Sequence, residues 1–213
     1  MTTRKKRNRS PEEVRQKILV AAEELFAEKG FAATSIREIA ARADVNSAMI
    51  YYYFDDKQGL YRSIIDLCSN ETYRMLLRAF KGKRDPSEQL REFCIEYARA
   101  HYLNRDIVKI MHREMFADDG HLSDFVSLYF RKSLDTVRDI LERGIDTGRF
   151  REVDIELTAA TLFGLILFIF LTEPVVASLR KQEALDEAAV VGITGELIDI
   201  FLAGIVKQHH QAK

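Results

Sequence analysis

Apolar residues recur every three or four positions along this chain, from residue 14 almost to its end. That spacing places them on one face of an α-helix, whereas a half-buried strand would alternate at every second residue. We find no convincing strand or hairpin pattern and no internal repeat. The pattern therefore predicts an all-α fold.

Helix-starting and helix-ending residues divide this pattern into segments. Ser10 followed by Pro11 is typical of a helix start, and Gly30 is typical of a helix end. Ser35 with Glu38 matches a capping box ahead of a second, short helix. Further boundaries are predicted at Asp44 with Asn46-Ser47, Asp55-Asp56, 82–86, 104–106, 118–120, 147–148 and Asp154.

Two short helices joined by a tight turn are predicted between residues 34 and 54. In the first, Ile36, Ile39 and Ala40 share one face, and in the second, Ile50 returns to the core with Tyr53 or Phe54. The remaining positions project outward: Asn46, Ser47, Ala48, Met49, Tyr51 and Tyr52. Three consecutive tyrosines on a helix cannot all face one core. The segment thus indicates a helix-turn-helix, whose second helix enters the DNA major groove.

In this region the chain resembles the TetR family of tetracycline-repressor-like regulators. The likeness covers roughly residues 12–61 and ends in the Lys-x-x-Leu motif, here Lys57-Gln-Gly-Leu60. The shared positions are Ile18, Ala21, Ala22, Leu25, Phe26, Gly30, Phe31, Thr34, Ile36, Ile39, Ala40, Ala43, Val45, Ile50, Tyr51, Tyr53 and Phe54. The resemblance implies an N-terminal three-helix DNA-binding domain and a C-terminal helical bundle for ligand binding and dimerisation.

The resemblance also implies roles for single residues. Thr34, Tyr51 and Lys57 would contact phosphate, while residues 46–49 and Tyr52 would face bases. The DNA-binding set is Thr34, Ser35, Asn46, Ser47, Ala48, Met49, Tyr51, Tyr52 and Lys57. The chain departs from the family pattern in three places: Asp44 stands where Gly is frequent, Ala48-Met49 where Gly-Thr is frequent, and Tyr52 where His is frequent. We expect these departures to alter the operator sequence and to leave the fold intact.

The charge is unevenly distributed over the 213 residues. The whole chain has a net charge of -1, but residues 1–61 hold 11 Lys and Arg against 9 Asp and Glu. Five of these cations lie in residues 4–9, where they either reach DNA or form a solvated tail. We predict a disordered basic arm over residues 1–9, a helix-turn-helix domain over 10–56, and an effector-binding and dimerisation domain over 57–213. No signal peptide is visible, so we expect a cytoplasmic protein.

The most apolar stretch of the chain, residues 157–171, is shorter than the roughly 20 residues that span a bilayer. We expect it to form a helix buried inside a bundle and at a subunit contact, and we expect no membrane partner. By resemblance, the last two helices pair with those of a second subunit as a four-helix bundle in a homodimer. The predicted interface contains Leu157, Thr161, Gly164, Phe168, Leu197, Ile198, Phe201, Leu202 and Ile205.

The family typically couples a small-molecule pocket in the C-terminal domain to the spacing of the two DNA-binding heads. Candidate lining residues are Phe93, Tyr97, His101, Met111, Glu114, Met115, Phe125, Tyr129, Phe163 and Phe168. Stripes of this kind are also ordinary core, and both interpretations stay open here. The apolar and aromatic side chains among these candidates suggest a hydrophobic or aromatic effector of unknown identity.

Enzymatic and metal chemistry is disfavoured by the sequence. His112 and Glu114 lie about 200° apart on a helix and do not converge. No phosphate loop, zinc motif or nucleophile elbow is present, and Cys68 and Cys94 fit a reduced, buried state. We therefore expect no catalytic site, no cofactor and no metal. The main alternative to an effector-released repressor is an architectural DNA-binding protein without an effector.

Overall fold

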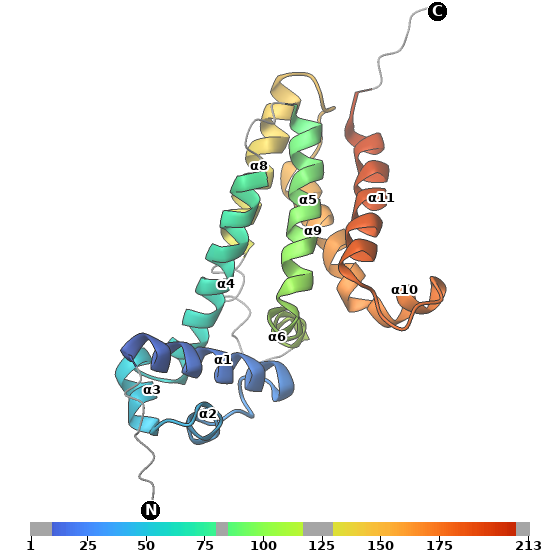
Figure 1. Ribbon diagram of the computed structural model, residues 1–213. Coiled ribbons are helices and arrows are strands. Elements are labelled where there is room, and N and C mark those ends of the chain that lie inside the picture. Colours follow the sequence, from blue (N-terminus) through green and yellow to red (C-terminus); the bar gives the residue numbers. More distant parts are fainter. Residues whose placement is uncertain (1–9, 80–84, 117–129, 208–213) are drawn as a thin grey trace, which may run out of the picture.

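The computed structural model describes residues 10–79, 85–116 and 130–207, and in these ranges the chain is built from α-helices (Figure 1). The helices are α1 (Pro11–Lys29), α2 (Ile36–Ala43), α3 (Ser47–Phe54), α4 (Lys57–Ala79), α5 (Pro86–Leu103), α6 (Arg105–Phe116), α8 (Arg131–Asp146), α9 (Ile155–Leu171), α10 (Glu173–Leu179) and α11 (Glu187–Ile205). Within those ranges the sole β-type pairing is an isolated bridge between Phe150 and Val206. The predicted all-α fold is confirmed.

A small head is formed by α1, α2, α3 and the start of α4 (Figure 1). The predicted capping box of Ser35 with Glu38 is present, and the helix start predicted at Ser10 also forms a capping box, in which Ser10 pairs with Glu13. Each box satisfies amide donors that a helix start leaves without partners. The apolar faces of these helices meet in a core whose members include Ile18, Ala22, Phe26, Ile39 and Ile50.

The turns of the head follow from local chemistry. Asp44 adopts a left-handed conformation with φ 54° between α2 and α3, as predicted for the turn. At the next turn, a Cβ added to Gly59 would lie 2.1 Å from the Phe54 carbonyl oxygen. This close approach requires glycine and sets how α4 leaves the head. Asp56 Oδ1 accepts a 2.6 Å hydrogen bond from the Gly59 amide, so the predicted acidic start caps α4.

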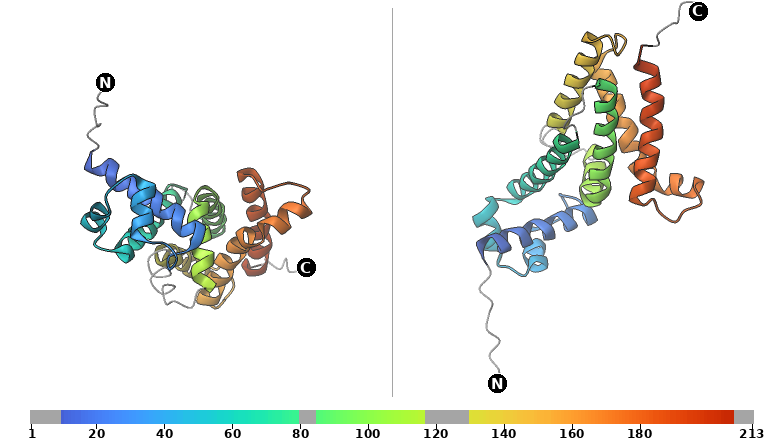
Figure 2. Two further views of the ribbon diagram at one scale, coloured as in Figure 1. Left: turned by 90° about the horizontal axis from the view of Figure 1, so that it is seen from below. Right: turned by 45° about the horizontal axis from the view of Figure 1, so that its top comes forward.

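The body consists of α5, α8, α9 and α11 standing roughly upright, with α4 rising into it from the head (Figures 1 and 2). Helix α5 is central because it packs against α4, α8, α9 and α11. Its predicted stripe of Leu90, Phe93, Cys94, Tyr97 and His101 is fully buried. The domain boundary between residues 56 and 57 remains a prediction, since α4 is shared: near its start, Tyr61 packs edge-on against Phe26 of the head.

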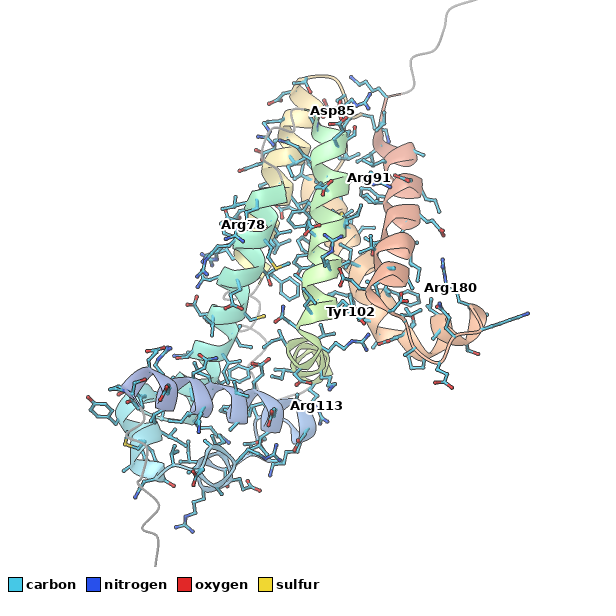
Figure 3. All side chains as sticks on the ribbon, viewed as in Figure 1. Arg78, Asp85, Arg91, Tyr102, Arg113 and Arg180 are labelled. Carbon is cyan, nitrogen blue, oxygen red and sulfur yellow. The ribbon has the colours of Figure 1, made fainter. Side chains whose placement is uncertain are left out.

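The head meets the body where α1 crosses the base of α4 and α6 (Figure 2). From α6, Arg113 Nη2 donates a 2.8 Å hydrogen bond to the Glu28 carbonyl oxygen at the end of α1 (Figure 3). Glu23 of α1 lies at the same junction, near Asp106 of α6 and Glu71 of α4. Burial, and then the charges of those carboxylates, raise the pKa of Glu23 to about 6.

The apolar helices of the body are only partly covered by this one chain. The stretch 157–171 was expected to be buried on all sides, inside a bundle and at a subunit contact. Within this chain α9 buries one face and exposes Leu157, Phe168 and Leu171, so the subunit contact stays a prediction. Helix α11 is long and apolar enough to cross a membrane by length and composition, and α9 with α10 passes only as a pair bent by 72°. Core helices of soluble proteins pass the same test. Helix α10 was not predicted from the sequence.

Candidate nucleic-acid interface and effector region

The exposed surface of α3 is made of neutral polar, small and aromatic side chains. Tyr51 and Tyr52 are 53% and 78% exposed, whereas Ile50 and Phe54 are buried and fix the helix to the head. Asn46 caps the helix by accepting a 2.8 Å hydrogen bond from the Ala48 amide. Because that bond uses its side-chain oxygen, the NH₂ group of Asn46 remains as a donor for a base.

Most of the predicted base-facing positions lie on this outer surface. Asn46 and Ala48 are exposed, and Ser47 is partly exposed. Met49 was also expected to project outward, but it is partly buried and packs against the core. Met49 lies one turn after Val45 and one turn before Tyr53, and all three side chains are partly buried against the core.

Two residues predicted to contact phosphate make hydrogen bonds inside the head. Thr34 is buried, and its hydroxyl donates to the Gly30 carbonyl oxygen at 2.8 Å, at the end of α1. Lys57 Nζ donates to the carbonyl oxygens of Phe31 and Thr34, both at 2.9 Å, and lies 4.2 Å from the centre of the Phe31 ring. Partial burial lowers the pKa of the Lys57 amine. Both side chains therefore hold the α1–α2 loop. Burial corrects the role predicted for the Thr34 side chain, whereas the partly exposed Lys57 amine keeps a third N–H, so its phosphate contact stays a prediction.

Arg37 is a cation at the DNA-binding end that sequence reasoning missed. It lies in the first turn of α2, is exposed, and has no ion pair among the residues that the structure describes. Its neighbour Ser35 is also exposed, although its hydroxyl donates to Glu38 at 2.7 Å. By contrast, Arg42 binds Glu24 and Glu28 of α1, which ties α2 to α1. Arg37 is thus available for phosphate and Arg42 is not.

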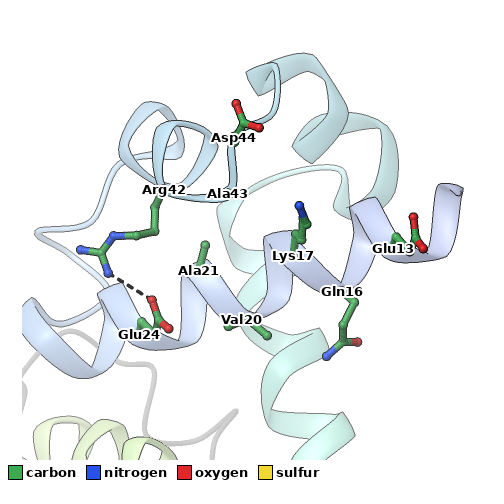
Figure 4. Close-up of a pocket in the computed structure, with 9 residues that line it drawn as sticks. All are labelled: Glu13, Gln16, Lys17, Val20, Ala21, Glu24, Arg42, Ala43 and Asp44. Carbon is green, nitrogen blue, oxygen red and sulfur yellow. Dashed lines mark hydrogen bonds and ion pairs between the residues drawn. The ribbon is translucent and has the colours of Figure 1, made fainter. Parts of the chain in front are cut away.

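An open groove of about 840 Å³ lies on the outer side of the head, between α1 and the end of α2 (Figure 4). Both signs of charge line it, with Glu13, Lys17 and Glu24 on α1 and Arg42 on α2 (Figure 4). Arg42 and Glu24 close one end through a 3.1 Å ion pair. Because the lining is mixed in charge and open to solvent, the groove does not match the enclosed, apolar effector site predicted in the body.

Four of the predicted effector residues come together in the body as one aromatic cluster. Phe93 stacks on Tyr97 with ring centres 5.5 Å apart, and Phe163 of α9 meets both rings edge-on. His101 lies 4.2 Å from Tyr97, and its Nδ1 donates to the Tyr97 carbonyl oxygen at 2.9 Å. All four side chains are buried. The cluster joins α5 to α9, so any molecule that enters it would alter the contact between these helices.

The other predicted effector residues have different outcomes. Phe168 is 58% exposed on the outer face of α9 and does not line an interior site, which corrects its assignment. The side chains of Met111, Glu114 and Met115, and residues Phe125 and Tyr129, lie outside the part of the chain that the structure describes.

The predicted dimer interface is divided by the structure into an accessible part and a buried part. On α9, Leu157, Thr161, Gly164 and Phe168 are exposed in a single line. A Cβ added to Gly164 would meet no atom within 4 Å, so this position lies on an open surface.

On α11, Leu197 and Phe201 are partly exposed, but Ile198, Leu202 and Ile205 are buried within the chain. These three were expected to face a partner, and the structure corrects this because their side of α11 packs on α5. Ile200, 72% exposed, lies on the open side of α11 and was missed.

Two family models match the chain. The model described as bacterial regulatory proteins, tetR family, matches residues 18–64, and the one described as the tetracyclin repressor-like C-terminal domain matches residues 83–170. Together these ranges include more than half of the chain and correspond to its head and most of its body.

Individual proteins are similar over long stretches. The probable HTH-type transcriptional regulator YttP of Bacillus subtilis is 31% identical over 61% of this chain and 64% of its own length. The match thus spans slightly less than two thirds of that relative. The HTH-type transcriptional repressor KstR2 of Rhodococcus jostii is 27% identical over 92% of this chain and 93% of its own length. The crystal structure of HlyIIR, a hemolysin II transcriptional regulator, is 25% identical, covers 93% of this chain and 100% of HlyIIR, and superposes with a TM-score of 0.68.

Proposed function

Because this chain belongs to the TetR family of bacterial regulatory proteins, we propose that it represses transcription by binding a palindromic operator as a homodimer. The family and the similar proteins are transcription regulators, which assigns the chain to that class and not to the enzymes. A small hydrophobic or aromatic effector would release the DNA. The basic residues within 1–9 either add contacts to DNA or form a solvated tail.

The exposed surface of α3 is the observation that carries this proposal. An eight-residue helix that shows Tyr51, Tyr52 and Ala48 to solvent, while Ile50 and Phe54 fix it in place, presents a rigid apolar and hydrogen-bonding ridge. Such a ridge fits a major groove, where amide and hydroxyl groups bond base edges and small apolar groups contact thymine methyls. The lack of Lys and Arg on α3 supports a role in sequence readout more than in charge neutralisation.

The proposal is tested with the variants Ser47→Ala and Tyr52→Ala. Their DNA affinity is measured by fluorescence anisotropy on an operator selected from a random DNA pool and on a random duplex of equal length. Each variant should lose operator affinity while random-duplex affinity stays within twofold, because these residues face bases. Arg37→Met serves as the matched variant, since loss of a phosphate contact should weaken both duplexes equally. Equal losses on both duplexes for Tyr52→Ala would refute base readout.

Dimerisation would occur through the outer faces of α9 and α11. The stripe of Leu157, Thr161, Gly164 and Phe168 repeats every three or four residues on the exposed face of α9, which packs beside α11. Two-fold pairing would bury these apolar side chains and place two heads on two half-sites of the operator. Phe168→Glu should give a monomer in sedimentation equilibrium, and an unchanged dimer would refute this interface.

Effector control would act on the contacts between body and head. Molecules that separate Phe93 and Tyr97 from Phe163 would move α5, which continues directly into α6 and its Arg113 contact with α1. An effector shifts this equilibrium only if it binds one state more tightly than the other. The test is a thermal-shift screen with aromatic and aliphatic acids, followed by operator release for each compound that binds. Compounds that release wild-type protein but not a Phe163→Ala variant would support the site.

An architectural protein without an effector is the competing function. It would bind DNA with weak sequence preference and strong salt dependence. The base-reading surface of α3 and the large body favour the repressor.

A further inference from the structure

Helix α10 carries an apolar face that nothing in the described chain covers. Val175 and Leu179 are 59% and 79% exposed, and Leu171 at the end of α9 is half exposed beside them. Pro174 and Ser178 share this outer side, while Ala177 is buried on the inner side. Contiguous exposed apolar side chains of this kind mark interaction sites in soluble proteins.

The structure holds this short helix in a fixed position. Arg105, at the start of α6, bonds both carboxylate oxygens of Glu173 at 3.2 and 3.3 Å. The same guanidinium donates to the Leu185 carbonyl oxygen at 3.0 Å, and the Leu185 amide donates back to Glu173 at 3.4 Å. Leu185 itself is buried. The apolar face is therefore presented outward by a braced helix, not by a loose loop.

The exposed face of α10 continues the exposed stripe of α9. Leu157, Thr161, Gly164, Phe168 and Leu171 follow one another at intervals of three or four residues and form a line along α9. After a 72° bend at Thr172, Val175 and Leu179 of α10 add further exposed apolar surface next in the chain. In Figures 1 and 2, α10 projects sideways from the body, beyond α11. A molecule seated on the outer face of α9 and α11 would therefore lie alongside α10.

We propose that α10 is an arm that grips the second copy of this chain, outside the four-helix contact made by α9 and α11. This rests on the dimer of the proposed function and adds a second contact to it. By two-fold symmetry each subunit would supply one arm, so the contact would form twice. Lys181, at the exposed tip, has no ion pair among the described residues and adds a positive charge there.

The test compares dimer dissociation constants by sedimentation equilibrium for wild type and for the double variant Val175→Glu/Leu179→Glu. The matched control is Arg131→Glu, which makes the same change of two negative charges at an exposed residue of α8, on the other side of the body (Figure 1). The double variant should dissociate at least tenfold more readily, and the control should stay within twofold. Circular dichroism melting of both variants checks that the helices remain folded.

The outcomes separate the arm from the dimer itself. A double variant that dimerises like wild type overturns the arm, while Phe168→Glu still tests the α9 and α11 contact. If neither change alters the dimer, the dimer face of the proposed function is wrong as well. A membrane occupant would also overturn the arm, and would appear as wild-type binding to phosphatidylglycerol vesicles that the double variant loses. Leu179→Met, which keeps the apolar surface, should retain wild-type dimerisation.

Discussion

Replacing Lys57 by Met should destabilise the head without changing the number of phosphates that the protein binds. The substitution keeps the alkyl chain but removes two 2.9 Å hydrogen bonds to the carbonyl oxygens of Phe31 and Thr34, and the contact with the Phe31 ring. Hydrogen bonds from a charged donor contribute about 1.5–3 kcal/mol each, and an exposed cation–π contact about 0.5–1 kcal/mol. Because the amine is partly accessible to water, we expect a total loss of about 2–3 kcal/mol.

The assay combines urea unfolding with operator binding over a series of salt concentrations. Each phosphate contact contributes about 0.9 to the slope of log affinity against log salt. Arg37→Met should therefore lower the slope by about 1.8 in a dimer, since both heads lose one contact, while its unfolding midpoint stays unchanged. Lys57→Met should show the reverse result, with a lower midpoint and an unchanged slope. A Lys57→Met slope that falls as far as that of Arg37→Met, at wild-type stability, would refute the structural role of Lys57.

Three further changes test other parts of the structure. Glu23→Gln should remove a pH dependence of stability, because the pKa of Glu23 is about 6 in the folded protein and 4.5 ordinarily, so that wild-type stability falls as pH rises from 4.5 to 6. At pH 7.5 the variant should be more stable than wild type by about 1 kcal/mol, after allowance for partial exposure. A stability difference that stays constant over pH 4–8 would contradict this. Gly59→Ala should lower the free energy of unfolding in urea by about 2 kcal/mol or more, because the new Cβ would lie 2.1 Å from the Phe54 carbonyl oxygen. A variant as stable as wild type would show that the turn can shift to make room for a side chain. Thr34→Val should lose about 1 kcal/mol and leave the salt slope unchanged, and a reduced slope would restore its phosphate role.

The parts of the head that the sequence predicts are those set by neighbouring residues. The helix start at Ser10-Pro11 and the capping box of Ser35 with Glu38 depend on residues at most three positions apart, and Asp44 suits its turn by its own conformational preference. The outward position of Tyr52 follows from helical spacing relative to Ile50. Each of these features needs no knowledge of the distant chain.

The roles that the sequence did not reveal depend on distant contacts. Lys57 bonds carbonyl groups 23 and 26 residues earlier, and no local pattern reveals that a cation so near the DNA-binding helix is already occupied. Arg37 was missed for the same reason, because its freedom is apparent only once the ion pairs of Arg42 and Lys29 are known.

In the body, uniform hydrophobicity removed the signal that distinguishes one helix face from another. Helix α9 is apolar on all sides, so its composition does not tell whether Phe163 or Phe168 faces inward. The same holds for α11, where Ile198 is buried while Ile200, two residues later, is exposed. Helix α10 is seven residues long, too short for a periodic pattern to predict.

Selection of bound duplexes from a random DNA pool, at a stated salt concentration, would show whether the protein reads DNA sequence as a dimer. Because one dimer carries two heads, the pool should become enriched in a palindrome whose two half-sites are spaced by about one helical turn or a multiple of it. The Tyr52→Ala variant should enrich a different sequence. Binding that is salt-sensitive but enriches no sequence would contradict a sequence-specific dimeric repressor.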